Sequence, residues 1–505
     1  MWYFSLKNLL FVLVLLLMRT VSAQFSTDVL VDHDPGNMTF GCCEAELVCG
    51  SDSTLYLVWF DDRLSSLMQA NIFISTSTDE GLTWSNEVKV DDQNSGHQIS
   101  PAIAIDQNDN LYCVWHQMAG SYEHVLFSKS TDSGVTWSAT VPVDNAPASA
   151  YIGSPDIKVN DANDILVVWD DNRSGSYRCQ FTKSTDGGTT WSPDLEFGGA
   201  QGQDPKIEFC EDTLYVVFGT YTSANDVFFT RSNDNGASWE PRVTVHSVTT
   251  GAQRYGDIGI SSSQILHCVW YDWRTSLCDI RYAKTTDGGN TWQPSTSICD
   301  STFEQNYYFG MEMHVVCAGE NWIYCTWDDW RLGYNNGYYD IWFTMSGDTG
   351  NTWQVPNLGV NDTVYGVSQR YPTICLAGDG NPCVAFSDNR ANGIHLYFDK
   401  GNFPGIHENK QTHLEAVYLH SYPNPFSLKT KISYSVLGAG NAELRVYDIS
   451  GKLVKIVSSK AHVPGTHTCH WYGEDAKGRK VPGGVYFLKY ENDNISVTEK
   501  LIYLR

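Results

Sequence analysis

The chain has 505 residues, of which 42% are apolar and 18% are charged, and its net charge is −25. This composition can fill a large β-rich core and excludes an intrinsically disordered chain. Because phosphate binding requires a basic face, nucleic acid is not an expected partner. The length allows one large domain of repeated units and one smaller domain.

The first 23 residues predict a secretory signal peptide. Lys7 precedes an apolar run over residues 9–18, and small residues at 21–23 precede a cleavage site at Gln24. A membrane anchor is the alternative, but the run is short for a bilayer span and Arg19 ends it. No transmembrane segment is expected after cleavage.

Fourteen cysteines in an exported chain permit disulfides. Cys317 and Cys325 are eight residues apart across an expected hairpin, as are Cys375 and Cys383. Each pair either bridges neighbouring strands or stays as buried thiols, which pack as small apolar groups. No Cys-x-x-Cys pair and no Cys/His spacing suited to zinc occurs, so neither a metal site nor a cofactor is expected.

An eight-residue pattern, Ser/Thr-x-Asp-x-Gly-x-Thr/Ser-Trp, occurs six times. Successive copies lie 53, 54, 48, 53 and 61 residues apart, measured between their aspartates, which are Asp79, Asp132, Asp186, Asp234, Asp287 and Asp348. A repeat of this period predicts an array of similar supersecondary units. Gly supplies the positive φ of a tight turn, Asp can accept hydrogen bonds from turn amides, and Trp can pack between units. Six copies therefore favour a structural role over a carbohydrate or calcium site.

Each unit predicts four short strands. The first is often led by Pro, the third runs into the repeated box, and the fourth is a polar outer strand after the Trp. The second is apolar on both faces, which is typical of a strand between two neighbouring sheets. The second strands are residues 55–59, 111–115, 165–169, 214–218, 265–270, 323–327 and 383–386.

Four antiparallel strands per unit, arranged in a ring, predict an all-β fold of the β-propeller type over residues 24–403. The second strands number seven, whereas the boxes number six. The last unit, residues 370–400, has only three strands, and the isolated strand at 29–31 would complete it. We therefore predict seven blades, with six as the alternative.

The composition changes after Phe403. Residues 404–413 form a polar linker, and from Lys410 onward there are 13 Lys/Arg against 8 Asp/Glu. Several short strands within 414–505 predict a small β-sandwich of immunoglobulin-like size.

The six boxes resemble the Asp-box, or BNR, repeats of sialidase-like propellers over about residues 46–353. Sialidases of this fold use three arginines, a Tyr–Glu nucleophile pair and an Asp acid/base, which the resemblance would imply here. Their Phe/Tyr-Arg-Ile-Pro motif is absent, and only echoes of it occur at 254–257 and 370–372. No catalytic residue is therefore assigned, and many activities share these repeats.

Three C-terminal stretches resemble the type A sorting domain of the type IX secretion system. They are Tyr422-Pro423-Asn424-Pro425-Phe426, residues 444–451 and residues 483–487. The resemblance implies a bacterium of the Bacteroidetes or a related lineage and passage across the outer membrane. It also implies the secretion machinery as a partner and a secreted or surface location.

The ligand site is expected on the face opposite the boxes, where loops enter the first strands and leave the second strands. Five blades repeat an aromatic-x-Asp-x-Arg pattern there, which indicates a structural ion pair. Residues that break the repeat are better candidates, because aromatic, Arg, Asp and Glu side chains suit a sugar or peptide. Ordinary solvated loop residues are the alternative. The candidates are His116, Tyr221, Arg254, Tyr255, Asp257, Tyr307, Glu312, Arg370 and Tyr371, with His97, Tyr151 and Gln203 on the same rim.

Two functions follow from this reading. The first is a secreted or cell-surface propeller that binds glycans or proteins without chemistry. The alternative is an exo-acting glycoside hydrolase of sialidase type.

Overall fold

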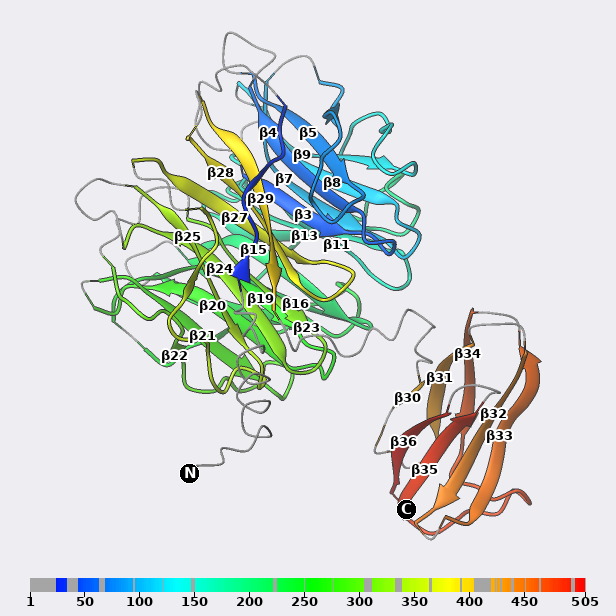
Figure 1. Cartoon of the computed structure of the whole chain (residues 1–505). Helices are drawn as coiled ribbons and strands as arrows, with labels where there is room; N and C mark the ends of the chain where they lie inside the picture. Colours follow the sequence, from blue (N-terminus) through cyan, green and yellow to red (C-terminus); the bar gives the residue numbers. More distant parts are fainter. Residues whose placement is uncertain are drawn as a thin grey trace, which may run out of the picture. The chain divides into compact units, whose positions relative to one another are not determined.

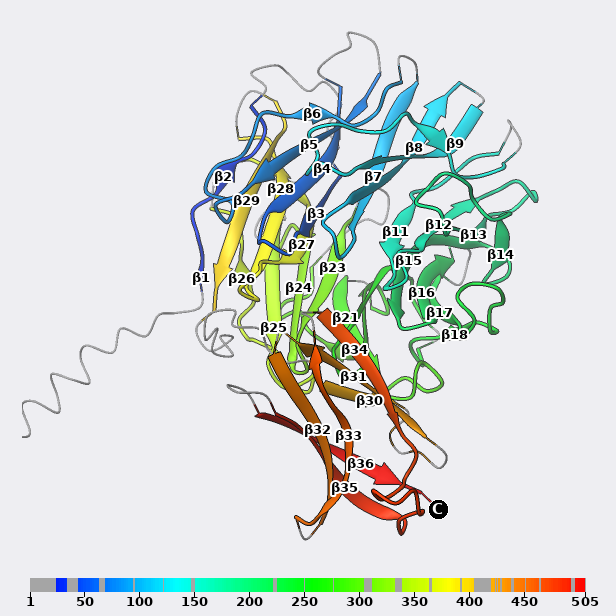
Figure 2. The same ribbon diagram turned by 90° about the vertical axis from the view of Figure 1, so that its right-hand side faces the viewer.

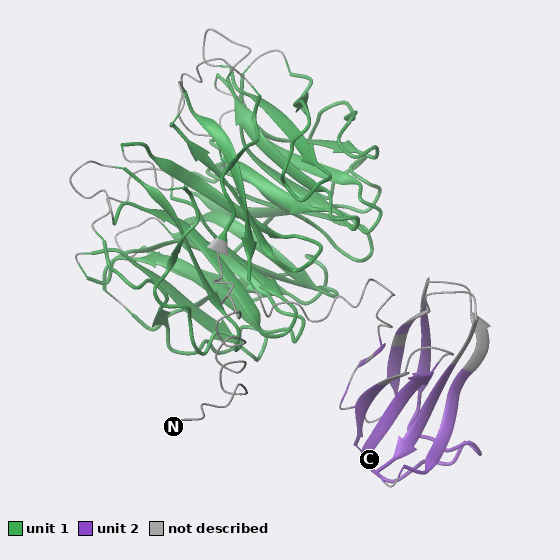
Figure 3. Cartoon of the chain, in the orientation of Figure 1, with its two compact units in different colours: residues 1–407 green, residues 408–505 purple. Residues whose placement is uncertain are grey.

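A computed structural model divides the chain into two compact units, residues 1–407 and 408–505 (Figures 1 and 3). In the first unit it describes residues 24–33, 44–62, 69–93, 96–120, 122–146, 150–220, 225–248, 250–275, 277–303, 311–331, 338–362, 366–390 and 393–403. In the second it describes residues 419–422, 424, 426, 429–436, 440–449, 451–462, 465–491 and 496–504. The predicted signal peptide and linker lie outside the described residues.

The first unit contains seven antiparallel sheets. The first three are β3 (Ala45–Cys49), β4 (Leu55–Asp61), β5 (Asn71–Ser77), β6 (Val88–Lys89); β7 (His97–Ile105), β8 (Leu111–Ala119), β9 (Tyr122–Ser130), β10 (Val141–Pro142); and β11 (Asp156–Val159), β12 (Ile165–Asp171), β13 (Arg178–Ser184), β14 (Leu195–Phe197). The next three are β15 (Gly202–Cys210), β16 (Thr213–Thr220), β17 (Asp226–Ser232), β18 (Val243–Thr244); β19 (Gln253–Ile260), β20 (Leu266–Asp272), β21 (Asp279–Thr285), β22 (Thr296–Ser297); and β23 (Met313–Ala318), β24 (Trp322–Asp329), β25 (Asp340–Ser346), β26 (Leu358–Gly359). The last is β27 (Gln369–Leu376), β28 (Pro382–Asp388), β29 (His395–Asn402), with β1 (Gln24–Phe25) and β2 (Val29–Leu30).

The first strands of the seven sheets form a closed ring. Each contacts the first strand of the next sheet, from β3 through β7, β11, β15, β19 and β23 to β27, and β27 contacts β3 (Figures 1 and 2). This is the arrangement of a seven-bladed β-propeller. The prediction of seven blades is confirmed, and the six-bladed alternative is wrong because residues 369–402 form a seventh sheet together with β1 and β2.

The second strands are buried on both faces, as their sequences predict. Every residue of β12, β20 and β28 is buried. Their large side chains fill the space between neighbouring blades, and the tryptophans of five of these strands are fully buried. These are Trp59, Trp115, Trp169, Trp270 and Trp327.

The N-terminal segment closes the ring. Val29 pairs with Phe398 of β29, which confirms the predicted closing strand. The two-residue strand β1 was not predicted. It takes the place of part of the seventh box, which the sequence lacks. Phe25 packs edge-on against Phe343 of the preceding blade at 5.0 Å, as a box Trp does, and the Ser26 amide donates to the Lys400 carbonyl at 3.2 Å. The residue after each box Trp makes the same backbone bond to its own third strand.

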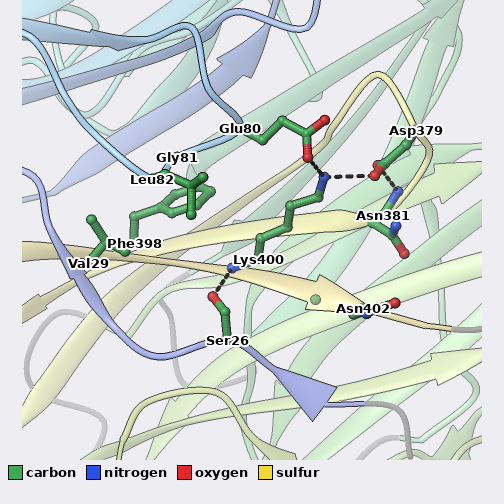
Figure 4. Close-up of a pocket in the computed structure, with 11 residues that line it drawn as sticks. Ser26, Val29, Glu80, Gly81, Leu82, Asp379, Asn381, Phe398, Lys400 and Asn402 are labelled. Carbon is green, nitrogen blue, oxygen red and sulfur yellow. Dashed lines mark hydrogen bonds and ion pairs between the residues drawn. The ribbon is translucent and has the colours of Figure 1, made fainter. Parts of the chain in front are cut away.

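A cavity of about 420 Å³ lies at this seam, on the same face of the ring as the boxes (Figure 4). Lys400 crosses it and donates to Glu80 at 2.6 Å and to Asp379 at 2.7 Å. In four other blades the equivalent basic side chain donates to a backbone carbonyl of the next box. Lys400 thus ties the last blade to the first through side-chain carboxylates.

The Asp boxes are tight turns held by one carboxylate. Asp287 accepts hydrogen bonds from the Thr285 hydroxyl at 2.7 Å, the Thr291 amide at 2.9 Å and the Thr291 hydroxyl at 2.6 Å. The Gly289 amide donates to the Thr285 hydroxyl at 3.1 Å. These bonds lower the pKa of Asp287 to about 2. The other five boxes repeat the same carboxylate contacts.

The boxes also join neighbouring blades. Trp191 packs edge-on against Phe127 of the preceding blade, with ring centroids 5.2 Å apart. Gly188 has a φ of +84°, and a Cβ there would lie 2.2 Å from the Phe127 ring. Four other boxes pair their Trp with an aromatic ring of the preceding blade in the same way. The Gly is therefore required by both the turn and the contact.

The second unit consists of two sheets around one core. One sheet has β30 (Leu419–Tyr422), β31 (Thr430–Val436) and β34 (Gly465–Trp471), and the other has β33 (Leu453–His462), β32 (Gly440–Asp448), β35 (Gly484–Glu491) and β36 (Ser496–Tyr503). Phe426, from the first C-terminal motif, packs on the buried Trp471 at 5.5 Å. The immunoglobulin-like classification of this unit stays a prediction.

Candidate functional site

A central channel of about 470 Å³ is lined by the first strands of all seven blades. Its wall contains both apolar and ionisable side chains. Lys158 pairs with Glu208 at 3.1 Å inside it. The other ionisable residues of the wall are Glu46, Asp156, Lys206, Asp257 and His314.

One end of this channel lies opposite the boxes. In each antiparallel sheet the first and third strands run in the same direction, and the third strand ends in the box. The first strands therefore begin at the opposite face. Glu44 and Glu312 directly precede their first strands, and Ser100 and Tyr371 lie within the first four residues of theirs. These four residues line a small cavity there together with Lys206. We call this end the channel mouth.

Four first strands carry a β-bulge at the channel mouth. The register shifts between residues 99 and 102, 203 and 206, 254 and 257, and 370 and 373. Inside each bulge one non-glycine residue has a positive φ, a conformation that costs energy for an L-residue. They are Ser100, Asp204, Tyr255 and Tyr371, with φ of 49°, 49°, 53° and 54°.

The structure brings six of the nine candidate residues to the channel or its mouth. Tyr255 and Tyr371 lie inside bulges, and Arg254 and Arg370 directly precede them. Glu312 directly precedes β23, and Asp257 lines the channel. Tyr221 and Tyr307 lie outside the described residues.

His116 lies elsewhere, in the wall between blades. Its side chain is buried, and its Nε2 lies 3.1 Å from the Glu123 carboxylate. Glu123 also accepts the Ile152 amide at 2.8 Å. The residue that breaks the repeat in the second blade therefore supports the loop that leads into the third blade.

Glu312, His314 and Asp257 form a chain of charges at the mouth. His314 lies 3.6 Å from Glu312 and 3.7 Å from Asp257. Burial lowers the pKa of His314, but the bond to Glu312 and the charge of Asp257 outweigh burial and raise it. Burial raises the pKa of Glu312, but His314, Lys206 and Arg370 together bring it below its ordinary value.

Glu44 has the opposite environment. Burial and the negative charge of Glu312 raise the pKa of Glu44 to about 7, against a hydrogen bond from Ser100. The mouth therefore holds two carboxyl groups whose environments move their pKa values apart. Glu44, Lys206 and His314 were not predicted, although Glu44 occupies the same pre-strand position as the predicted Glu312 and could have been found by that equivalence.

Arg370 is partly neutralised by a neighbouring carboxylate. Its Nε lies 3.4 Å from Asp328, and its guanidinium stacks over Tyr339 at 4.3 Å. Burial raises the pKa of Asp328 to about 6, although Arg370 opposes this shift. The Tyr271 hydroxyl donates to Asp328 at 3.1 Å. The carboxylate that binds Arg370 is therefore itself held by a hydrogen bond.

The aromatic-x-Asp-x-Arg pattern forms ion pairs inside the blades. Arg274 pairs with Asp272 at 2.6 Å, and the Trp270 indole donates to the same carboxylate at 3.0 Å. The same Asp–Arg pair occurs in three further blades. Arg63, of the first blade, lies outside the described residues. These arginines are engaged by their own blades.

Neither a metal centre nor a disulfide is seen in the described part of the chain. No group of three or more His, Cys, Asp or Glu is placed there to hold a metal ion. The twelve described cysteines are free thiols. In the strand register, Cys375 lies opposite Cys383, whereas Cys317 lies opposite Ile323 and not opposite Cys325. Within the same residues, no helix is long and apolar enough to cross a membrane.

Comparison with known families gives two matches. Residues 50–268 match the BNR repeat-like domain, and residues 420–504 match the secretion system C-terminal sorting domain. No curated protein matches the chain. The sorting domain implies handling by the type IX secretion system and export to the cell surface or extracellular space.

Similar folds occur in solved structures of low sequence identity. A Hadza microbial sialidase is 15% identical, with 56% of this chain and 62% of that one covered and a TM-score of 0.44. The NanB sialidase from Streptococcus pneumoniae is 11% identical, with 75% and 71% covered and a TM-score of 0.43. An ulvan lyase is 10% identical, with 76% and 96% covered and a TM-score of 0.49. The match spans less than two thirds of the Hadza sialidase. The chain thus carries a BNR-repeat domain with sialidases among its structural neighbours, followed by a C-terminal secretion sorting domain.

Proposed function

We propose that this exported protein binds a glycan at the channel mouth. The observation that carries the proposal is the set of four bulged first strands, which hold Ser100, Asp204, Tyr255 and Tyr371 at positive φ around one opening. Strained residues of this kind persist where the surrounding structure fixes them, and they gather at ligand sites. Non-glycine residues at positive φ also occur in four box turns and in five turns between first and second strands. Among the described strands of the ring, however, only these four first strands carry bulges.

The chemistry of the mouth suits sugar hydroxyls. Carboxylates such as Glu312 accept hydrogen bonds, and Arg370 donates them. A protein ligand is the other partner class that such a surface takes. We favour a glycan because the charged groups around the opening, among them Glu312 and Arg370, match the hydroxyl groups of a sugar that lies across it.

Hydrolysis of a glycosidic bond is the second candidate. It is favoured by Glu44 and Glu312, because one carboxyl group with a pKa near 7 and one ionised carboxylate is the pairing that a general acid and its partner require. This scheme uses two carboxylates and needs no Arg-Ile-Pro motif. Glu44→Gln would then abolish turnover while glycan binding persists.

The test is binding of the purified full chain to a glycan array, with turnover measured on sialosides and neutral glycosides. We expect Glu312→Gln to weaken binding of the best glycan about tenfold, as loss of one charged hydrogen bond does. Glu240→Gln, just after a box Trp, is the matched carboxylate control and should bind normally. Equal losses in both variants, or no glycan bound by the wild type, would contradict the proposal.

The route of export is proposed together with this function. We infer that residues 1–23 are removed and that residues 414–505 address the chain to the type IX machinery. Deleting residues 414–505 should leave the propeller in the periplasm, as judged by cell fractionation. Normal delivery to the surface without that segment would overturn this assignment.

A further inference from the structure

Tyr151 is the most exposed aromatic residue among the propeller residues whose side chains the structure describes. It is 45% exposed, whereas the other Trp, Tyr and Phe side chains described there are at least partly buried. Tyr151 precedes β11, on the face of the ring that holds the channel mouth. An exposed ring is informative when the backbone beneath it is fixed.

The backbone of Tyr151 is clamped on both sides. Its amide donates to the Asn172 side chain at 2.9 Å, and its carbonyl accepts the Asn172 amide at 3.1 Å. The next residue, Ile152, is fully buried, and the Gly153 amide donates to the Asp170 carbonyl at 2.7 Å. The ring of Tyr151 therefore projects from a rigid segment and loses little entropy on contact with a ligand.

Two further rings support Tyr151 edge-on. Tyr177 lies 5.9 Å away, and the buried His116 lies 6.3 Å away, between ring centroids. Glu123 joins His116 to the loop by accepting the Ile152 amide at 2.8 Å. The break in the repeat at His116 thus places a ring against Tyr151 and helps to hold it in position.

Three acidic residues act electrostatically on the Tyr151 hydroxyl. Burial raises its pKa first, and the nearby charges of Glu123, Asp170 and Asp204 raise it further. Asp170 is itself buried beside Asp204, whose amide donates to it at 3.0 Å. Asp204 is also one of the four bulge residues of the channel mouth. The acidic residues near Tyr151 therefore extend to the mouth.

We propose that Tyr151 is an outer sugar subsite, which stacks on a pyranose ring of an oligosaccharide whose end unit lies in the channel mouth. This inference rests on the proposed glycan-binding function and extends it from one sugar unit to several. The sugar at Tyr151 is uncharged, because the nearby carboxylates of Glu123 and Asp204 would repel a sugar carboxylate. Tyr177 and His116 are positioning residues for this subsite.

The test compares short and long neutral oligosaccharides by isothermal titration calorimetry on the full chain. The probes are the disaccharide and hexasaccharide of the cello, manno and N-acetylated chito series. We expect the wild type to prefer one hexasaccharide. Tyr151→Ala should lower affinity for that hexasaccharide roughly tenfold and leave the disaccharide unchanged, whereas Tyr151→Phe should bind like the wild type.

Tyr472→Ala is the matched control, because Tyr472 is 44% exposed on the C-terminal unit. It should leave both affinities unchanged. If Tyr151→Ala binds the hexasaccharide normally while Glu312→Gln does not, the subsite is wrong and the proposed function stands. If the wild type binds none of the probes, the neutral subsite is overturned, whereas the proposed function falls only if the glycan array also shows no binding.

Discussion

The two faces of the propeller obey different rules. On the box face, six turns repeat one set of hydrogen bonds, and the seam replaces the seventh turn with Phe25 and Ser26. At the channel mouth the side chains change from blade to blade, with Gln-Arg-Tyr shared by two blades and a Glu before the first strand shared by two others, and four first strands are bulged. Repetition marks the parts that hold the ring together, whereas departure from repetition marks the parts that a ligand would contact.

The largest expected effect concerns the seam, where Phe25 and Ser26 take the place of a seventh box. If Phe25 replaces a box Trp, Phe25→Ala should destabilise the propeller by about 3–5 kcal/mol, the usual cost of removing a buried aromatic ring. Phe25→Trp restores the residue type of the boxes and should be tolerated. Urea unfolding measures both. A loss below 1 kcal/mol in Phe25→Ala would show that the ring closes without this contact.

Substitution of a box glycine should cause the next largest loss of stability. Gly188→Ala forces a Cβ to 2.2 Å from Phe127 at a φ of +84°, and it should cost about 3 kcal/mol from overpacking and backbone strain together. Gly175→Ala is the matched control, because its φ is +85° and nothing lies within 4 Å. It should cost only about 1 kcal/mol. Equal losses would mean that the contact between blades contributes nothing.

The sequence predicted the box face better than the mouth. Boxes, buried second strands and the strand at 29–31 follow from patterns of residue type. The pair β1 was missed because Phe25 stands alone without a box, although Phe25-Ser26 parallels Trp84-Ser85. The bulges at Tyr255 and Tyr371 could not be predicted, since one residue at positive φ leaves no periodic signal. Lys206 and His314 were missed because they alternate with apolar residues as any strand residue does.

The boxes should also impose an acid dependence. Hydrogen bonds hold the pKa of Asp287 at about 2, below its ordinary value, so its contribution to stability is complete above about pH 4 and is lost as the pH falls toward 2. Asp287→Asn should therefore lower the thermal midpoint at pH 7 and change it little at pH 2. The two midpoints can be read by circular dichroism. An equal decrease at both pH values would contradict a role for the carboxylate charge.

The smallest expected effect separates the two faces most cleanly. Asp204→Gly relieves a φ of 49° and removes the repulsion with Asp170, so it should raise stability by about 1 kcal/mol while weakening glycan binding. Asp204→Ala removes the charge and keeps the strained backbone, so it should weaken binding without the full gain in stability. Denaturation and calorimetry together check this. Unchanged binding in both variants would remove Asp204 from the site.

We propose that the ligand binds at the channel mouth and that the boxes only stabilise the ring. Hydrogen–deuterium exchange of the full chain, with and without the best-binding glycan, tests it most directly. Peptides that contain residues 44–46, 100–102, 203–206, 254–257, 312–314 and 370–373 should exchange more slowly with glycan, while the six boxes stay unchanged. Protection confined to the boxes, with none at the mouth, would contradict the account.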